Sequence, residues 1–198
     1  SGMALSIKSE KPSITADMLK SVDSLLATHS TRYTNSSANR AYNIVKASNS
    51  TSDIVLMPGE EFSYNTSTGP RSRSNGYKDA PVIVNGKVQD GSGGGVCQVS
   101  TTIYNSALYS GLDITNVRNH SLPSTYAPKG KDATVAYGSI DLKFKNNFAH
   151  PIYIKNIVAN GAITSKIYGC NQDREKLYIR TQESREKDKI IVKTYRVF

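Results

Sequence analysis

The fold of this chain is organised around Gly91-Ser-Gly-Gly-Gly-Val-Cys-Gln-Val-Ser-Thr-Thr102, where three consecutive glycines lead into a cysteine. Beyond the cysteine, apolar residues recur at close to helical spacing, at Val99, Ile103, Ala107 and Leu108. Gly111 then stands where a glycine commonly ends a helix. The pattern predicts a helix that begins at or near Cys97 and is approached by flexible backbone.

The place of Cys97 at a helix start favours a reactive thiol. Free N–H groups and the helix dipole stabilise a thiolate there, which lowers the pKa of the thiol. Glycines such as Gly94 and Gly95 let backbone N–H groups approach a ligand or a developing oxyanion. Gln98 either supplies an oxyanion donor or only occupies the first turn. The alternative for Cys97 is a small buried structural residue, which is the commoner use of a lone cysteine.

Length and charge narrow the class of protein. The chain has 198 residues and a net charge of +9, enough for one domain, or one domain with a small appendage. A basic surface favours anionic partners, such as anionic lipid or wall polymers. Nucleic acid is disfavoured because the basic residues are scattered and no nucleic-acid motif is present. No run approaches the ~18 apolar residues of a membrane-spanning helix.

The two cysteines, Cys97 and Cys170, are too few for a disulfide framework. We expect both to be free, the alternative being a single disulfide that would silence Cys97. A metal site built on Cys97 and His120 is disfavoured because no ligand-spaced pair supports it. No cofactor is expected.

Outside the glycine-cysteine segment, the pattern predicts two N-terminal helices and a mainly β remainder. The first helix spans residues 13–28, and the second is capped by Ser37 or Asn39. Strands follow over residues 54–57, 81–89 (a hairpin around Asn85-Gly86), 114–118, 133–137, 140–145, 151–158, 162–168, 177–181 and 190–197. The strands over 151–158 and 162–168 are expected to form a second hairpin across Asn160-Gly161. The expected fold is α+β: the helix starting at Cys97 packs on an antiparallel sheet from residues 112–168, and the N-terminal helices cover another face or edge.

A nucleophilic cysteine needs a base, and the base needs an orienting group. His120 is the best-placed base, because it follows the strand to which the Cys97 helix returns. His150 lies in a turn, and His29 ends the first predicted helix. Asp132 and Asp141 both follow His120, and either can orient it.

A basic, glycine-flanked segment precedes the cysteine. It carries Arg71, Arg73 and Tyr77, which are suited to holding a carboxylate of a wall peptide or a phosphate. The alternative is a solvated basic loop.

The chain also resembles the VanW-like domain family, which is named from vancomycin-resistance clusters. The matching elements are Asn39-Arg-Ala-Tyr-Asn-Ile44, Met57-Pro-Gly-Glu-Glu-Phe-Ser-Tyr-Asn65, Gly69-Pro-Arg71, Gly76-Tyr77, Ala80-Pro81, Gly93-Gly-Gly-Val-Cys-Gln-Val-Ser-Thr-Thr102, Gly111-Leu112, His120-Ser121, Asp132-Ala-Thr-Val135, Asp141-Leu-Lys-Phe-Lys-Asn146 and Pro151-Ile-Tyr-Ile154. The resemblance implies a bacterial protein of the cell envelope, outside the cytoplasm and often part of a longer, anchored chain. It divides the chain into a helical lead-in over residues 1–29, a VanW-like domain over 30–169, and a charged, β-rich extension or further module over 170–198.

The order of residues is, in addition, similar to that of transglutaminase-like thiol enzymes. There a cysteine at a helix start is followed by a strand, a histidine and an aspartate. The resemblance implies that Cys97 is the nucleophile, His120 the general base and acid, and Asp132 the orienting group. The sequence departs from that pattern in Ser121-Leu122, where many such enzymes have an aromatic residue.

Two functions from different classes therefore follow. The first is a cysteine-dependent peptidase, amidase or acyl transferase that acts on amide bonds of peptidoglycan or wall peptides through a thioester. The second is a non-catalytic module that binds wall glycan, peptide or another protein and uses Cys97 structurally.

Overall fold

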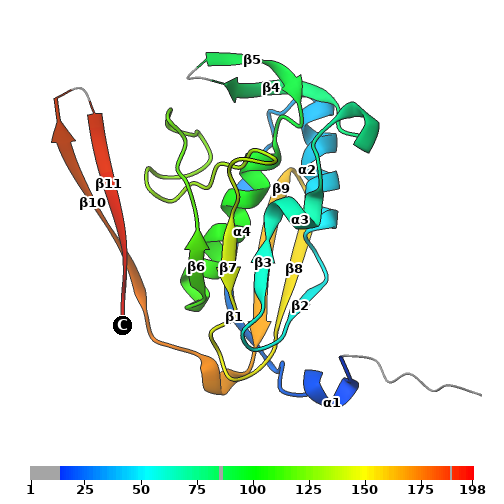
Figure 1. Cartoon of the computed structure of the whole chain (residues 1–198), viewed down its shortest axis with the longest axis vertical. Helices are drawn as coiled ribbons and strands as arrows, with labels where there is room; N and C mark the ends of the chain where they lie inside the picture. The colour runs from blue at the N-terminus through cyan, green and yellow to red at the C-terminus, as the bar shows by residue number, and fades with distance from the viewer. Residues whose placement is uncertain (1–13, 85–86, 188) are drawn as a thin grey trace, which may run out of the picture.

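The computed structural model describes residues 14–84, 87–187 and 189–198. A four-stranded antiparallel sheet has the order β1-β9-β8-β2, and a three-stranded antiparallel sheet has the order β3-β7-β6. Two separate hairpins, β4-β5 and β10-β11, complete the strands. Helix α4 lies between these parts, over β1 and β9, and α2 packs beside it (Figure 1). The expected α+β fold with a central helix on an antiparallel sheet is thus confirmed.

The bounds of the strands are β1 Ser24–Arg32, β2 Ile54–Leu56, β3 Glu61–Ser63, β4 Asp79–Val84, β5 Lys87–Ser92, β6 Asp113–Asn116, β7 Lys143–Lys145, β8 Ile152–Ala159, β9 Ala162–Gly169, β10 Tyr178–Glu186 and β11 Lys189–Val197. The α-helices are α1 Ala16–Leu19, α2 Ala38–Ser50, α3 Tyr64–Thr68 and α4 Val96–Ser110, and the short 3₁₀ turns are Arg73–Asn75 and Asn171–Asp173.

The two long helices begin and end where their sequences indicate. The hydroxyl of Ser37 accepts the N–H of Arg40 and so caps α2. Gly111 adopts φ +96° and closes α4 by donating its N–H to the carbonyl of Ala107. The glycine and serine signals therefore set the limits of both helices.

The prediction of a helix over residues 13–28 is wrong for most of its length. Only Ala16–Leu19 is helical, and Ser24–Arg32 forms β1, paired with β9. A register shift between Leu25 and Ala27 marks a bulge in this strand. The bulge interrupts the alternation of inward and outward side chains, so that the apolar spacing imitates a helix.

The hairpin β8-β9 carries much of the sheet's buried face. Alternate residues point inward along both strands, including Ile154 and Ile167, which are fully buried. The predicted turn has Asn160 at φ 51° and Gly161 at φ 69°, the left-handed pair that suits a tight hairpin. The hairpin β4-β5 is also present, although its predicted turn, residues 85 and 86, lies outside the described residues.

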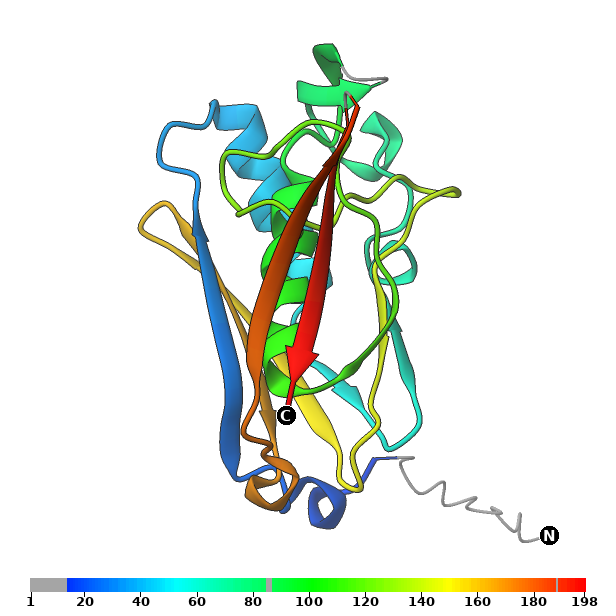
Figure 2. The same ribbon diagram turned by 90° about the vertical axis from the view of Figure 1, so that its left-hand side faces the viewer.

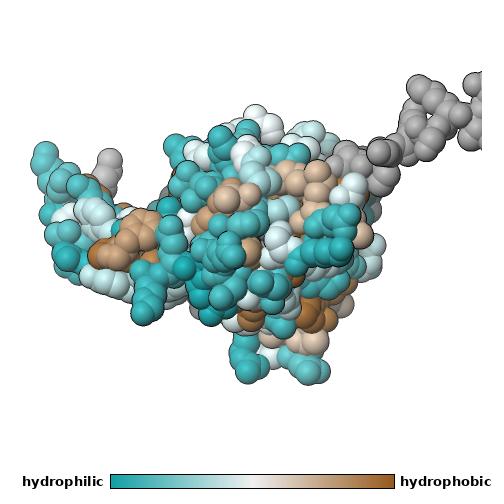
Figure 3. Space-filling model, turned by 90° about the horizontal axis from the view of Figure 1, so that it is seen from below, coloured by the Kyte–Doolittle hydropathy of each residue, from teal (hydrophilic) through white to brown (hydrophobic). Residues whose placement is uncertain are grey.

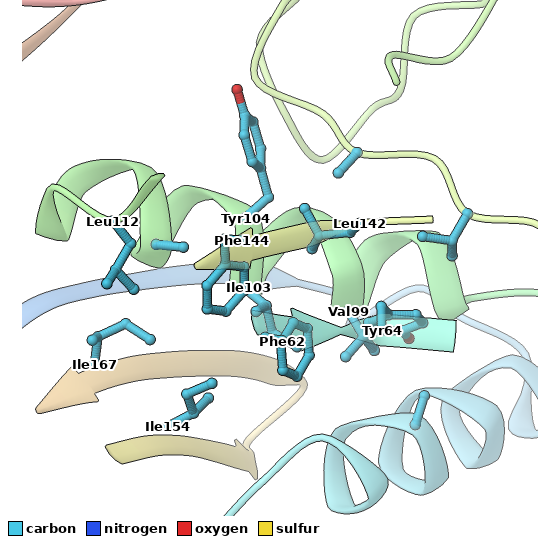
Figure 4. Packing of buried hydrophobic residues seen from close by; sticks show 14 of the residues in the cluster. Phe62, Tyr64, Val99, Ile103, Tyr104, Leu112, Leu142, Phe144, Ile154 and Ile167 are labelled. Atoms are coloured by element: carbon cyan, nitrogen blue, oxygen red, sulfur yellow. The ribbon is translucent and has the colours of Figure 1, made fainter. Parts of the chain in front are cut away.

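The core joins the two sheets to α4. The stacked rings of Phe62 and Phe144, 4.6 Å apart between centroids, come from β3 and β7. Val99 and Ile103 of α4 and Ile154 of β8 are buried in the same cluster (Figure 4). The surface, in contrast to the core, is mainly polar. Seen from below, hydrophobic residues form small, separate patches on a mainly hydrophilic face (Figure 3).

The segment between β6 and β7 contains little regular structure. Residues 133–137 and 140–145, predicted as strands, contribute only β7 and a single bridge between Ala136 and Ile140. The reason is that side chains of α4 form hydrogen bonds with backbone N–H and carbonyl groups of this segment. A neighbouring strand would otherwise bond to those groups. We call residues 117–135 the His120 segment.

The C-terminal hairpin β10-β11 lies across the front of α4 and the His120 segment when the molecule is turned by 90° (Figure 2). The hydroxyl of Thr194 donates to the carbonyl of Gly130, 2.7 Å away. Arg196 donates to the carbonyl of Leu112, also at 2.7 Å. The hairpin therefore braces the segment that carries His120.

Candidate active site

The three glycines before α4 are each required by close packing. A β carbon on Gly94 would lie 2.6 Å from the carbonyl oxygen of Pro81. Gly93 and Gly95 have φ of +86° and +107°, and β carbons there would lie 2.8 Å from Arg71 and 2.9 Å from Ile44. The triglycine therefore brings the start of α4 directly against β4 and α2, which no larger residue allows.

Cys97 is the second residue of α4, as predicted, and its thiol is only partly buried. The N–H of Val135 donates to Sγ at 3.5 Å, and Thr134 Oγ1 lies 3.7 Å from it. Burial of the thiol opposes its ionisation and is the largest single influence on its pKa. The neighbouring His120 and the hydrogen bond from the Val135 backbone outweigh that effect, so the pKa of Cys97 lies below its ordinary value.

His120 is fixed by Asp132. Nδ1 of the ring lies 2.6 Å from Asp132 Oδ2, and the backbone N–H of His120 donates to the same oxygen at 2.7 Å. Asn119 donates to the other carboxylate oxygen at 3.0 Å. With Nδ1 engaged in this way, the other ring nitrogen is the one available to Cys97.

The electrostatics of this pair favour an ionised thiol beside a charged imidazole. Burial lowers the pKa of His120, but the hydrogen bond to Asp132 and the neighbouring Cys97 raise it, to about 9 in total. The same imidazole holds the pKa of the Asp132 carboxyl below its ordinary value, against the effect of burial. The lowered pKa of the Cys97 thiol and the raised pKa of the His120 imidazole both favour the charged forms, a thiolate beside an imidazolium that the Asp132 carboxylate supports.

Polar side chains of α4 attach the His120 segment to the helix. The hydroxyl of Ser100 donates to the carbonyl of Ala133 at 2.6 Å, and Thr101 accepts the Ala133 N–H at 2.9 Å. Asn105 donates to the carbonyl of Lys131 at 2.7 Å. These bonds lie on either side of Asp132 and set its position relative to Cys97.

Cys97 and His120 open into a cavity of about 460 Å³. Its lining residues are Arg40, Arg71, Pro81, Val82, Ser92, Gly93, Gly94, Gly95, Val96, Cys97, Gln98, His120, Tyr126, Thr134, Val135, Ala136, Tyr137 and Ile140. The volume is within the usual range of small-molecule and peptide sites. A second cavity, of about 470 Å³, lies between the His120 segment and β11 and is lined by both His120 and Asp132.

Several of the residues proposed from the sequence lie in this cavity, and others do not. Arg71, Gly94 and Gly95 line it. Arg73 is exposed and paired with Asp79, and Tyr77 is buried in the core, so neither lines either cavity. Asp141 accepts hydrogen bonds from Ser63 and Asn65 at the start of α3. Of the two aspartates left open by the sequence, Asp132 is the one that contacts His120.

The side chain of Gln98 faces away from the thiol. Its amide nitrogen donates to the carbonyl of Arg32 and to Thr31, and its oxygen accepts from Arg40 at 2.8 Å. With both ends engaged, this side chain supports Arg40 rather than acting as an oxyanion donor. Arg40 and Tyr126 line the cavity as well, although the sequence pattern did not nominate them. The ring of Tyr126 meets His120 edge-on, with centroids 6.4 Å apart. Arg40 stands in Asn39-Arg-Ala-Tyr-Asn-Ile44, one of the motifs that resemble the VanW-like family, and that motif is the signal that could have indicated it.

Among the described residues, no group of three or more His, Cys, Asp or Glu side chains is placed to hold a metal ion. Both cysteines are free, as expected. The helices of the described chain include none long and apolar enough to span a membrane.

Comparison with known proteins places this site in a family. The profile described as VanW like protein matches residues 39–168, which include the triglycine, Cys97, His120 and Asp132. The chain belongs to the VanW-like family. This confirms the resemblance found in the sequence, and membership suggests association with the cell envelope.

Two curated relatives of this VanW-like chain are informative. Uncharacterized protein YoaR of Bacillus subtilis is 34% identical over 161 residues, covering 81% of this chain and 53% of the relative. Vancomycin B-type resistance protein VanW of Enterococcus faecalis is 32% identical over 114 residues, covering 55% of this chain and 42% of the relative. The chain thus spans about half the length of the relatives it matches. No solved structure is significantly similar to it.

Proposed function

We propose that this VanW-like chain is a cysteine-dependent enzyme that cleaves or transfers amide bonds of peptidoglycan or wall peptides through a thioester. The observation that carries the proposal is the placing of Cys97, at the start of α4, and His120 in the lining of one cavity, with Nδ1 of His120 held 2.6 Å from Asp132 Oδ2. A thiolate, a base that can give and take a proton, and an orienting carboxylate are what nucleophilic acyl transfer needs.

In the first step, Sγ of Cys97 forms a bond to the amide carbon, and the electrons of the carbonyl pass to its oxygen. As the carbon–nitrogen bond breaks, His120 gives its proton to the departing amine, leaving a thioester and a neutral imidazole. Asp132 keeps the imidazole oriented throughout, because it holds Nδ1 at 2.6 Å.

In the second step, water or an amine of another peptide attacks the thioester. His120 takes the proton of the attacking group, the carbon–sulfur bond breaks, and the thiolate of Cys97 returns beside the imidazolium. Water gives hydrolysis and an amine gives transfer, so the same residues serve a peptidase, an amidase or an acyl transferase.

The start of α4 offers a donor for the oxyanion formed in both steps. Within the described part of the chain, the N–H of Cys97 donates to no protein acceptor, whereas those of Val96 and Gln98 donate to Gly93 and Gly95. A free N–H at a helix start, beside the attacking sulfur, matches the geometry of oxyanion stabilisation.

The proposed setting is the bacterial cell envelope, outside the cytoplasm, in a longer protein that is anchored or secreted. Family membership supports the envelope, and the net charge of +9 supports contact with anionic wall polymers. The proposed partners are wall peptide or glycan, with no role for nucleic acid.

A covalent intermediate is the direct test. Purified protein is incubated with wall-derived peptides, quenched in acid and analysed by intact-protein and peptide mass spectrometry. Wild type and Cys170→Ala should gain an acyl group on Cys97 and release a smaller amine-containing fragment. Cys97→Ala should do neither, and His120→Asn should be slower by a factor of 100 or more. Unchanged peptides with wild type, under conditions where the peptides bind, would reject the enzyme.

The alternative is a non-catalytic wall-binding module. It is favoured by the packing of Cys97 against the hydrophobic core and by the Val135 N–H that its sulfur accepts. In that case Cys97→Ala should bind wall fragments as wild type does while losing thermal stability.

A further inference from the structure

Two arginines flank the triglycine in the cavity that contains Cys97. The side chain of Arg40, from α2, packs on Gly95, since a β carbon there would lie 3.1 Å from Arg40 Cγ. Arg71 packs on Gly93 in the same way, with a corresponding distance of 2.8 Å to its Cβ. Both line the cavity. Because Gly93 and Gly95 are two residues apart, the two arginine side chains pack on the same short turn.

Neither guanidinium has an acidic partner within the described part of the chain. Arg40 donates to Ser36 and Gln98, and Arg71 donates to Asn65 and the carbonyl of Gly69. All of these acceptors are neutral. Arg73 and Arg196, by contrast, are paired with aspartates outside this cavity.

The lack of an acidic partner among the described residues is energetically unfavourable, in particular for the guanidinium of Arg40. Burial is the main influence on its pKa and lowers it. A partly desolvated cation without an ion partner is destabilising unless a ligand supplies the missing charge. Each guanidinium has five N–H donors, and the named acceptors leave some of them unused in both side chains.

The remaining lining of the cavity increases the positive charge. Among the side chains that the structure describes, this lining includes no aspartate or glutamate. The pKa of His120 rises to about 9, and the N-terminus of α4 adds the positive end of its dipole. The described side chains of the lining thus supply two guanidinium groups and the His120 imidazole on the positive side.

We propose that Arg40 and Arg71 together bind a free carboxylate of the peptide whose amide Cys97 attacks, so that the scissile bond lies next to a carboxylate. The proposal rests on the function proposed above and specifies its substrate. Two guanidinium forks match planar carboxylates through paired N–H donors. Tyr137 also lines the cavity, with the centroid of its ring 5.9 Å from the Arg71 guanidinium carbon.

The test compares a wall-derived peptide that has a free C-terminal carboxylate with the same peptide as its C-terminal carboxamide. Calorimetry is done on Cys97→Ala protein, so that binding is measured without turnover. We expect the carboxylate form to bind at least tenfold more tightly. Adding Arg40→Met or Arg71→Met should remove most of that preference, and Arg40→Lys should lose much of it, because an ammonium keeps the charge without the fork.

Arg73→Met is the matched control, because this exposed arginine lies in the same segment but outside the cavity. It should keep the full preference, and thermal melting should show that all variants are folded. Equal binding of the two peptide forms, no binding of either, or an equal loss in Arg73→Met would overturn the proposal. Competition by inorganic phosphate at concentrations similar to those of the carboxylate peptide would also do so, because the site would then select any anion.

The outcomes for the two proposals are separable. Selective binding of the carboxylate without a thioester on wild-type Cys97 would leave the arginine site in a non-catalytic module. A thioester formed equally from both peptide forms would leave the enzyme and remove the arginine site.

Discussion

Replacing the carboxylate of Asp132 by an amide should raise the pKa of Cys97. The change Asp132→Asn keeps the size of the side chain and removes the charge that holds His120 as an imidazolium. His120 loses its strongest support, the Cys97 thiolate then loses its cation, and alkylation of Cys97 should require a higher pH.

The size of the effect follows from His120. Its pKa rises from 6.5 to about 9, and its side chain is only 8% exposed, so solvent screens the interaction weakly. At about 1.4 kcal/mol for each tenfold change in proton affinity, the rise corresponds to roughly 3 kcal/mol in favour of the imidazolium. The hydrogen bond to Asp132 is the largest influence that raises this pKa, and burial opposes it. Without the carboxylate, the pKa of His120 should fall towards 6.5 or below.

Stability is a poor measure of this change, because two linkages oppose one another. The pKa of His120 is raised by folding, so its contribution is complete below pH 6.5 and is lost as pH rises through about 9. The pKa of Cys97 is lowered by folding, so its contribution is complete above pH 9 and is lost as pH falls through the folded value. As pH rises, the His120 contribution decreases while the Cys97 contribution increases, so the two slopes of stability against pH have opposite signs.

The rate of iodoacetamide alkylation, followed at the Cys97 peptide by mass spectrometry from pH 5 to 10, isolates the thiolate. Wild type should show an inflection below pH 9, and Cys170, which is 5% exposed, should label slowly throughout. In Asp132→Asn the inflection should move up by about one pH unit or more, which lowers the rate near pH 7 about tenfold. Asp141→Asn, which alters a buried carboxylate at α3, is the matched control and should leave the inflection in place. An inflection that stays within about 0.3 of wild type in Asp132→Asn would refute the reasoning.

Three further predictions concern the elements that hold the site together. Gly94→Ala should destabilise the protein by about 1–3 kcal/mol and slow Cys97 alkylation, because its β carbon would lie 2.6 Å from the Pro81 carbonyl. Gly59→Ala is the control: a β carbon there meets nothing within 4 Å, so alkylation should be unchanged. Asn105→Leu should lower the free energy of unfolding in urea by about 1–3 kcal/mol, because the Lys131 carbonyl loses its donor. The same change should shift the inflection of Cys97 alkylation against pH. An unmoved inflection would show that this bond does not position Asp132. Thr194→Val should cost about 1 kcal/mol by removing the bond to Gly130, and an unchanged denaturation midpoint would mean that β10-β11 does not brace the His120 segment.

The sequence predicted those parts of the fold that depend on local signals. The cap at Ser37, the turn at Asn160-Gly161 and the glycine limits of α4 are encoded within a few residues of the elements they define, and all are confirmed. The prediction of a helix over residues 13–28 was wrong because β1 pairs with β9, which lies far along the chain. This pairing overrides the local spacing of apolar residues. Tertiary pairing of this kind leaves no local trace, and the bulge removes even the alternation.

The candidate site was predictable only in part for the same reason. Chain order was enough to nominate Cys97, His120 and Asp132, and the structure brings their side chains together. The choice between Asp132 and Asp141 depended on how the irregular His120 segment is attached to α4, which spacing does not reveal. Arg40 reaches the cavity from α2 and is placed by Gln98 and Gly95, contacts that exist only once the helices are packed.

The attachment of the His120 segment to α4 has a consequence for how such proteins diverge. Asp132 and its neighbours are tied to the helix through Lys131 and Ala133, and His120 is tied to Asp132. The intervening residues 121–125 are mostly exposed, and Ser121 and Ser124 line the second cavity. Substitutions and changes of length can therefore accumulate in that stretch without displacing the reacting groups. Related proteins should differ most there, and with those differences they should acquire different preferences for the molecules they accept.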